Sequence, residues 1–269
     1  MHYLIKQFIP PIAKTLRWYS FKYGWKGNYH SFEEANKKAG GYHEQAILER
    51  IKLTTRKVVN KEIAYERDGI EYDQPIMNVN MLSALLLIAS KNNNQLTVLD
   101  FGGSLGTTYY HKAPFLSHLT KFHWCIVEQP NYVDAGKAGF ETDQLHFYYT
   151  IDECLEHYQP DIVIFCGVIQ YIEKTYELLE EIKNKKIPYL FLDYIGYNDE
   201  PKDRICIQHV PPVFYGVDAS YTCWFYDKQK MFNWLNQYYE MIFEFISEPN
   251  KYYIELKPFF YEGQFWKLK

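Results

Sequence analysis

The sequence has little of what marks membrane-spanning, disulfide-bonded or nucleic-acid-binding proteins. No apolar run reaches the length of a transmembrane helix, and LLLIAS at 85–90 is far too short. The five cysteines are an odd number and form no CxxC motif, so we expect reduced thiols in a cytoplasmic protein and neither a disulfide framework nor a zinc site. The net charge of −4 argues against a nucleic-acid partner. No spacing of His, Asp and Glu predicts a metal site.

The N-terminal segment, residues 1–26, is rich in basic and aromatic residues, and the first acidic residue of the chain is Glu33. It does not read as a signal peptide, because Pro10 and Pro11 interrupt its apolar part and no small-residue cleavage site follows. Such a segment either makes weak peripheral contact with the inner face of a membrane or packs as a helix on its own domain. We expect it to pack on the domain.

With 269 residues, 47% of them hydrophobic, the chain suits one large globular domain with an appendage. Residues 31–62 have helical spacing, begin at a capping box formed by Ser31 and Glu34, and are interrupted by two adjacent glycines. The polar stretch 65–75 predicts a loop or a short hairpin, and residues 76–91 predict another helix.

From residue 96 the pattern changes to alternating strands and helices, which predicts a parallel sheet. The predicted strands are Leu96–Phe101, Phe122–Glu128, His146–Tyr149, Ile162–Cys166 and Tyr189–Asp193. A predicted helix, Lys228–Gln237, then precedes two longer strands, Tyr239–Ile246 and Phe259–Leu268, which we expect to close the sheet as an antiparallel pair. The expected fold is α/β and Rossmann-like, with a helical cap over residues 1–75 and a sheet domain over residues 76–269.

The stretch LDFGGSLG, residues 99–106, directly follows the first predicted parallel strand. Ligands of open α/β sheets bind at this end of the strands, where glycines let the backbone approach them. Phe101 stands where a dinucleotide fingerprint needs its first glycine, and no Gly-Lys-Ser/Thr follows as in a Walker loop. The spacing instead resembles the first motif of class I S-adenosylmethionine-dependent methyltransferases, D/E-x-G-x-G-x-G. Its residues here are Asp100, Gly102, Gly103, Ser104 and Gly106. Ser104 replaces the middle glycine and fits there if its backbone angles are ordinary.

Other strand ends carry residues that would complete an adenosyl site. They are Glu128, Gln129, Asp152, Cys166 and Gly167. An acid at the end of the second strand, here Glu128, can accept both ribose hydroxyls of an adenosine, although a solvated acid gives the same pattern. Asp152 either faces the adenine or is the N-cap of the next helix. Just beyond the fourth strand, Gln170 and Tyr171 are expected to reach the methyl acceptor.

Over most of its length the chain resembles a family of methyltransferases from bacterial surface-polysaccharide gene clusters. The most specific islands are LDFGGSLGTTYY at 99–110 and QHVPPVFYGVDASYTCWFY at 208–226. Two departures fall on the acceptor side, because LDYIG lacks the Arg expected beside Asp193 and Thr222 replaces a usual Pro. The resemblance implies a class I methyltransferase core, S-adenosylmethionine as cofactor, and O-methylation of a glycan or its precursor.

The candidate residues for binding or activating the methyl acceptor come from the later loops and from the stretch YERDG at 65–69. Methyl transfer to a hydroxyl needs a proton acceptor, and we expect His209, in a proline-rich loop, to be the base, with Asp193 either orienting it or binding the acceptor. His43 is a weaker candidate. Arg67 either binds an anionic acceptor group or belongs to a solvated turn. Tyr221 either stacks on a sugar or packs in the core.

The leading hypothesis is an O-methyltransferase acting on a sugar, or a sugar precursor, of capsule or lipopolysaccharide. One alternative is methylation of a phosphate-type oxygen, which needs no base. A second is an NAD-dependent sugar dehydrogenase or epimerase, which Phe101 disfavours. A third is a cofactor-binding scaffold that assists glycan assembly without catalysis.

Overall fold

The computed structural model describes residues 23–40, 44–74, 77–198, 200–255 and 257–269. The expectation for the basic segment therefore lies almost entirely outside the described residues, as does that for His43. Within the described ranges, no helix combines the length and apolarity that a membrane crossing requires.

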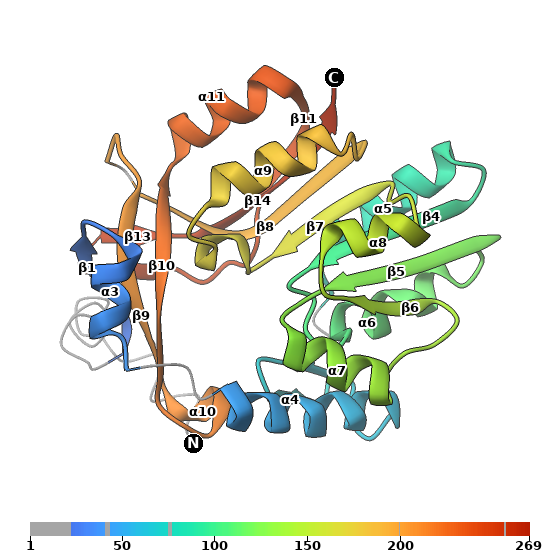
Figure 1. Ribbon diagram of the computed structural model, residues 1–269, viewed down its shortest axis with the longest axis horizontal. Coiled ribbons are helices and arrows are strands. Elements are labelled where there is room, and N and C mark those ends of the chain that lie inside the picture. The colour runs from blue at the N-terminus through green and yellow to red at the C-terminus, as the bar shows by residue number, and fades with distance from the viewer. Residues whose placement is uncertain (1–22, 41–43, 75–76, 199, 256) are drawn as a thin grey trace.

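The centre of the molecule is a parallel sheet with the strand order β6-β5-β4-β7-β8 (Figure 1). These strands are β4 (Gln95–Phe101), β5 (Lys121–Val127), β6 (Leu145–Tyr148), β7 (Ile162–Cys166) and β8 (Tyr189–Asn198). They match the five predicted strands, except that β8 is longer than expected. Beyond β8, the strands β14 (Tyr261–Leu268) and β11 (Tyr239–Ile246) form the expected antiparallel pair. The predicted fold class, a mostly parallel Rossmann-like sheet closed by antiparallel strands, is confirmed.

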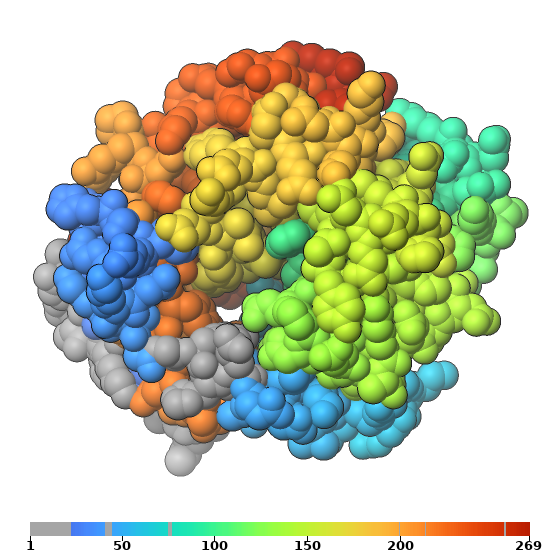
Figure 2. Space-filling view, viewed as in Figure 1, coloured from blue at the N-terminus to red at the C-terminus, as the bar shows by residue number. Residues whose placement is uncertain are grey.

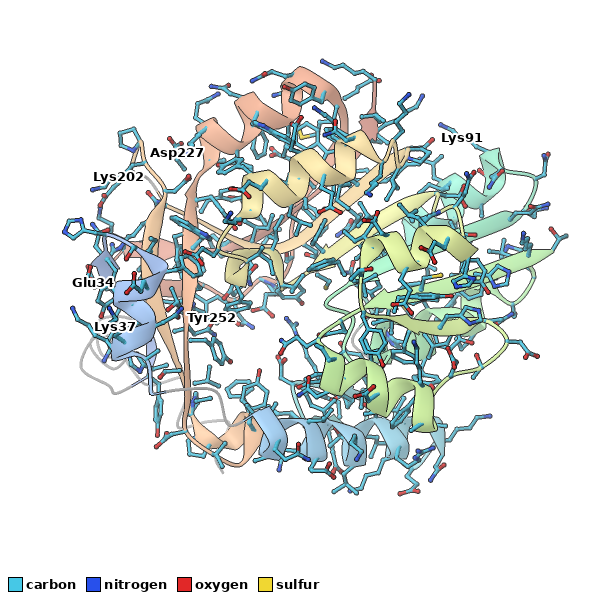
Figure 3. All side chains as sticks on the ribbon, in the orientation of Figure 1. Glu34, Lys37, Lys91, Lys202, Asp227 and Tyr252 are labelled. Atoms are coloured by element: carbon cyan, nitrogen blue, oxygen red, sulfur yellow. The ribbon has the colours of Figure 1, made fainter. Side chains whose placement is uncertain are left out.

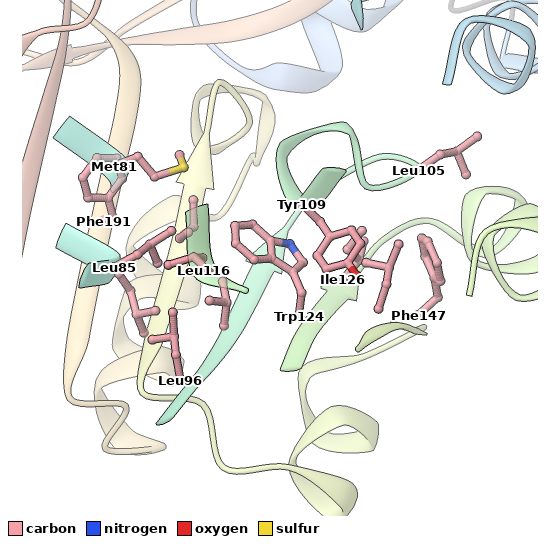
Figure 4. Close-up of a cluster of buried hydrophobic side chains, with 14 of the residues drawn as sticks. Met81, Leu85, Leu96, Leu105, Tyr109, Leu116, Trp124, Ile126, Phe147 and Phe191 are labelled. Atoms are coloured by element: carbon pink, nitrogen blue, oxygen red, sulfur yellow. The ribbon is translucent and has the colours of Figure 1, made fainter. Parts of the chain in front are cut away.

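Helices cover both faces of this sheet because successive strand residues point to opposite sides. One core contains Val98 and Trp124, together with residues of α5 (Val79–Lys91), α6 (Thr107–Leu116) and α7 (Pro130–Gly139) (Figure 4). The other contains Leu99 and Cys125. Its helices are α8 (Ile151–His157), α9 (Thr175–Asn184) and α11 (Lys228–Tyr238). The two cores fix the strands, and thereby the loops that follow them.

An extension of the sheet beyond β8, with both antiparallel and parallel pairs, was not predicted. Its hairpin consists of β9 (Arg204–Val210) and β10 (Ala219–Asp227), joined through the short helix α10 (Pro212–Tyr215). The strands β1 (Gly24–Tyr29), β12 (Tyr252–Ile254) and β13 (Lys257–Phe259) continue it beyond β9. The proline-rich stretch is therefore a strand and a hairpin tip, not a long loop. Pro211 and Pro212 follow β9 and precede or begin α10, so they end the strand without excluding it.

The N-terminal cap contains α3 (Phe32–Lys38), α4 (Glu44–Val59) and the small hairpin β2 (Tyr65–Arg67) and β3 (Ile70–Tyr72). As predicted, Ser31 caps α3, and its Oγ accepts a hydrogen bond of 3.1 Å from the Glu34 N–H. Helix α4 contacts both α6 and α10, so the cap and the β9–β10 hairpin close a ring with the sheet. The space-filling view is hollowed at the centre of this ring (Figure 2). The carboxyl ends of the parallel strands face this hollow.

Candidate functional site

The glycine turn after β4 has a backbone that only small residues tolerate. Gly102 and Gly106 have φ angles of 72° and 91°, and added side chains would come within 2.5 Å of Val168 and 2.9 Å of Leu145, respectively. Ser104 also has a positive φ, 53°, which corrects the expectation of ordinary backbone angles. The turn ends at the first residue of α6, where free backbone N–H groups are suited to an anion or a polar ligand.

Asp100 supports this turn from beneath. Its side chain is 2% exposed, and the indole Nε1 of Trp124 donates a hydrogen bond of 3.0 Å to its Oδ2. A Cβ at Gly103 would lie 2.7 Å from the same oxygen, so the glycine is what lets the turn close over the carboxyl group. Burial, with a smaller contribution from the charge of Glu128, raises the pKa of Asp100 to about 7.

Glu128 directly follows β5 and lies beside the glycine turn. Its carboxylate accepts a hydrogen bond of 2.6 Å from the Gln129 N–H and another from the backbone of Ser104. Burial raises its pKa, and these hydrogen bonds act in the opposite direction. Gln129 is exposed at the N-cap position of α7. The structure thus brings the predicted acid and the predicted turn together at one edge of the sheet.

The end of β7 forms the floor of the same edge. Gly167 has a φ of 72°, and its N–H donates to the Asp193 carbonyl at 2.9 Å. The Cys166 thiol lies 3.9 Å from Asp193 Oδ2. Gln170 is buried and turns back, with its Nε2 donating to the Gly167 carbonyl at 3.1 Å. Tyr171, in the 3₁₀ turn η1 (Ile169–Tyr171), is half-buried and points toward the β9–β10 hairpin.

Among the described residues, none of the contacts of Asp152 links it to the sheet edge that carries the glycine turn and Glu128. Thr150, not Asp152, is the N-cap of α8, because its Oγ accepts from the Glu153 N–H at 3.1 Å. The Asp152 carboxylate is exposed and forms an ion pair with Lys185 beyond α9. A surface ion pair is the role that this geometry supports, in place of a contact with adenine or a helix cap.

The cap contributes two charged residues that point in opposite directions from β2. Glu66 is buried and accepts hydrogen bonds from the hydroxyls of Thr107 and Thr54, which joins the cap to the first residue of α6. Burial raises the pKa of Glu66. The Arg67 guanidinium lies over the Tyr194 ring, 3.8 Å from its centroid, and its side chain is 32% exposed. Its positive charge reaches the sheet edge, where it opposes the rise in the pKa of Asp193.

Asp193 is fully buried, and its carboxylate already has several partners. Asn78, the N-cap of α5, donates to Oδ2 at 2.6 Å, and the Tyr194 N–H donates to Oδ1 at 2.8 Å. Ser247 adds a further hydrogen bond. Burial nevertheless raises the pKa of Asp193. This carboxylate joins β8 to the start of α5.

His209 lies on a strand and faces away from Tyr171, which corrects its prediction as a loop residue aimed at the acceptor. It is paired with Ser220 across the β9–β10 ladder, and Ser220 Oγ accepts from the Gly40 N–H at 2.6 Å beyond α3. Cross-strand partners share one face of a sheet, whereas neighbours along a strand point to opposite faces. The residue on the inner face is therefore Gln208.

The inner face of the hairpin carries an aromatic pair. The Tyr171 hydroxyl donates to Gln208 Oε1 at 2.5 Å, and the ring of Tyr171 packs edge-on against Tyr221 with centroids 5.3 Å apart. The Tyr221 hydroxyl also meets that of Tyr215 at 3.3 Å. Side chains project toward the centre of the ring from the hairpin, the cap and the sheet edge (Figure 3). Gln208, Tyr194 and the buried Lys112 were not predicted, since the strand boundaries that place the first two were not visible in the sequence.

The residues at this edge fit an adenosyl cofactor. The positive φ angles of Gly102 and Gly106 form a turn that carries no side chains at these two positions, the start of α6 offers N–H groups, and Glu128 offers a carboxylate for a ribose. The Ser104 Oγ is buried with no hydrogen-bond partner in the described part of the chain. Within the same ranges, no group of three or more His, Cys, Asp or Glu is arranged to hold a metal ion.

No protein-family model matches this chain, and no curated protein matches it in sequence. Among solved structures, it is similar to an S-adenosylmethionine-dependent methyltransferase from Clostridium acetobutylicum, with 12% identity over 72% of this chain and 92% of that one and a TM-score of 0.45. It is also similar to the 1,6-didemethyltoxoflavin-N1-methyltransferase of Burkholderia thailandensis, with 10% identity, 86% and 91% coverage and a TM-score of 0.44. The N-terminal domain of EvdMO1, crystallised with S-adenosylhomocysteine and D-fucose, gives 13% identity, 84% and 100% coverage and a TM-score of 0.45. At these identities and TM-scores the likenesses identify no function.

Proposed function

We propose that this chain is an S-adenosylmethionine-dependent methyltransferase that acts in the cytoplasm. The observation that carries the proposal is the pairing of β4 with β5, in which the Gly102 N–H donates to the Val127 carbonyl at 2.9 Å and so places the glycine turn beside Glu128. In this assignment Glu128 binds the ribose, the turn and the start of α6 lie against the cofactor, and Cys166 and Gly167 form the floor.

The cofactor, when bound, supplies a methyl group on a positively charged sulfur. The protein's own task is then to exclude water and to hold an acceptor oxygen in line with that methyl group. The ring formed by the sheet edge, the cap and the β9–β10 hairpin is suited to this task, since it surrounds the hollow that the strand ends face.

We propose a sugar or glycan precursor with an anionic group as the acceptor. The support is the resemblance of the islands at 99–110 and 208–226, together with the chemistry of the inner surface. Tyr171 and Tyr221 offer aromatic surface of the kind that packs against sugar rings. Arg67 offers a partly exposed cation for a phosphate or a nucleotide diphosphate.

Methylation of a phosphate-type oxygen is the second candidate, and two observations favour it. Asp193 is fully buried with its oxygens already hydrogen-bonded, and His209 points to the α3 side of the hairpin. A sugar hydroxyl must lose its proton to a base, whereas an ionised phosphate oxygen reacts without one. A rate that is constant between pH 6 and 8 with a phosphorylated acceptor would favour this candidate. A rate that rises through one ionisation would favour the hydroxyl.

The proposal is tested first by cofactor binding. S-adenosylmethionine and S-adenosylhomocysteine should raise the melting temperature of the purified protein, because a ligand at 100 times its dissociation constant adds about 2.7 kcal/mol to stability. NAD should not. Gly106→Val is the matched negative control, since a side chain there meets Leu145 at 2.9 Å and φ is 91°. Stabilisation by NAD alone would refute the proposal, and cofactor binding without turnover of any glycan precursor would favour a scaffold.

A further inference from the structure

Lys112 is a buried cation that lacks a matching anion. It lies in α6, its side chain is 1% exposed, and its Nζ contacts the Met77 sulfur at 3.9 Å. Throughout the described residues, no carboxylate lies within ion-pair distance of this Nζ. Lysines are almost never fully buried unless they are paired, because removing an ammonium group from water is costly.

The position of Lys112 relates it to the edge of the sheet that binds the cofactor in the proposed function. Helix α6 begins directly after the glycine turn, and Met77 precedes Asn78, which reaches Asp193. The charges that act most strongly on Lys112 belong to Cys166 and Asp193, at the ends of β7 and β8. Burial lowers the pKa of Lys112 to about 8, so the side chain is mostly protonated at neutral pH.

Neither Asp193 nor Cys166 neutralises the positive charge of Lys112. The Asp193 carboxylate accepts its hydrogen bonds from Asn78, Tyr194 and Ser247, and burial raises its pKa. Burial also raises the pKa of the Cys166 thiol well above its usual value, so it is neutral. An anion that reached the ends of β7 and β8 beside this ammonium group would therefore meet a protonated lysine whose one direct contact in the described residues is a thioether.

We propose that Lys112 binds the carboxylate of the amino-acid part of the adenosyl cofactor. This inference rests on the proposed function, and it assigns the buried cation and the partly exposed one to different ligands. Arg67, stacked on Tyr194 and close to Asp68, remains for the acceptor, while Lys112 neutralises the one anionic group that the cofactor carries. A charge-assisted hydrogen bond in a buried site is among the strongest single contacts that such a site can offer.

The test compares two ligands that differ only in this carboxylate, S-adenosylmethionine and decarboxylated S-adenosylmethionine, by calorimetry. Lys112→Met should weaken binding of S-adenosylmethionine at least about tenfold and change binding of the decarboxylated ligand by less than about twofold. Lys121→Met, at an exposed site at the start of β5, should change neither. Equal losses for both ligands, or no loss for either, would overturn the assignment. If the unaltered protein binds neither ligand, the proposed function itself fails.

Should Lys112→Met not fold, the unaltered protein still tests the assignment through pH. The carboxylate binds the protonated lysine, so affinity for S-adenosylmethionine should be constant below pH 8 and fall above it. The decarboxylated ligand shares the cofactor's amino group but not its carboxylate, so the ratio of the two affinities isolates Lys112. The facing groups, Cys166 and Asp193, act on both ligands alike. A ratio that does not change between pH 7 and 9.5 would contradict the proposal.

Discussion

The half-buried carboxyl group of Glu128 and the buried one of Asp100 lie at one sheet edge, and their partners give them different expected roles. Backbone N–H groups of Ser104 and Gln129 hold Glu128, whereas Asp100 is held by the Trp124 indole under Gly103. Glu128, held by backbone N–H groups, can still accept hydrogen bonds from the hydroxyls of a ribose. Asp100 cannot, because the closed glycine turn covers its carboxyl group.

Glu128→Ala should therefore weaken binding of S-adenosylhomocysteine at least about tenfold, because charge-assisted hydrogen bonds to the ribose are each worth about 1.5 to 3 kcal/mol. Glu128→Gln, which keeps the shape and removes the charge, should lose less. Calorimetry measures both, and the melting temperature without ligand checks that each variant is folded. Unchanged affinity in the Ala variant would remove Glu128 from the site.

Asp100 should instead control stability as a function of pH. Its folded-state pKa of about 7 lies above the ordinary value of 3.8, so its protonated form is favoured by folding. The stabilising contribution is complete below pH 3.8 and is lost as pH rises through 7. Asp100→Asn, which keeps an acceptor for the Trp124 N–H, removes this titration.

The melting temperature of Asp100→Asn, relative to the unaltered protein, should consequently rise between pH 5 and 8. The difference in free energy of unfolding changes by at most about 1.4 kcal/mol per pH unit. A difference that stays flat over this interval would mean that Asp100 is not the titrating group. Ligand affinity measured on the same samples separates this structural role from a role in binding.

At the scale of elements, β9 shows how a shift of one residue changes a functional assignment. The sequence QHVPP at 208–212 predicted a proline-rich loop with the imidazole of His209 as the base. The ladder with β10 instead aims Gln208 at Tyr171 and places His209 on the α3 side with Ser220. Side chains alternate along a strand, so residue type cannot identify the inner face until the strand and its register are known.

Two substitutions in β9 test this alternation. His209→Ala should leave both cofactor affinity and turnover close to those of the unaltered protein. Gln208→Ala, its neighbour and matched comparison, frees the Tyr171 hydroxyl and should raise the KM for the acceptor about fivefold, the effect of one neutral hydrogen bond. Steady-state kinetics on the two variants decide the matter. A large loss of kcat in His209→Ala alone would restore the imidazole as the base.

The elements that the sequence predicted well share a strong local pattern. The apolar runs of β4, β5 and β7 are buried on both faces, and Gly102 and Gly106 after β4 mark the turn that their positive φ angles form. The hairpin β9–β10 lacked such a signal. Its side chains point alternately toward Tyr171 and toward the α3 side, and its tip contains two prolines. Likewise, the burial of Lys112 follows from how α6 packs near Met77, a contact that no local pattern encodes.

At the scale of the whole molecule, the cap does more than cover the sheet. Glu66 joins β2 to the first residue of α6, and α4 contacts α10 at the tip of the β9–β10 hairpin. A chain segment from before the parallel sheet and another from after it thereby surround the same hollow. Glu66 of β2 bonds to the start of α6, while the next residue, Arg67, lies over Tyr194 of β8. In the proposed function, Glu66 supports the cofactor side of the ring and Arg67 faces the acceptor.

Arg67→Ala tests this division directly. Loss of the guanidinium should reduce kcat/KM for a phosphorylated acceptor at least about tenfold, since a charge-assisted contact to an anion is lost. Affinity for S-adenosylhomocysteine should not change, because the contacts of Arg67 run to Tyr194 and Asp68 and not to the glycine turn. Lys52→Ala removes an exposed cation from α4 and serves as the control for a nonspecific charge effect. With a neutral sugar as acceptor, Arg67→Ala should have a much smaller effect. An equal loss of kcat/KM with both acceptors would show that Arg67 maintains the structure of the ring and does not bind the anion. A loss of affinity for S-adenosylhomocysteine would place Arg67 on the cofactor side.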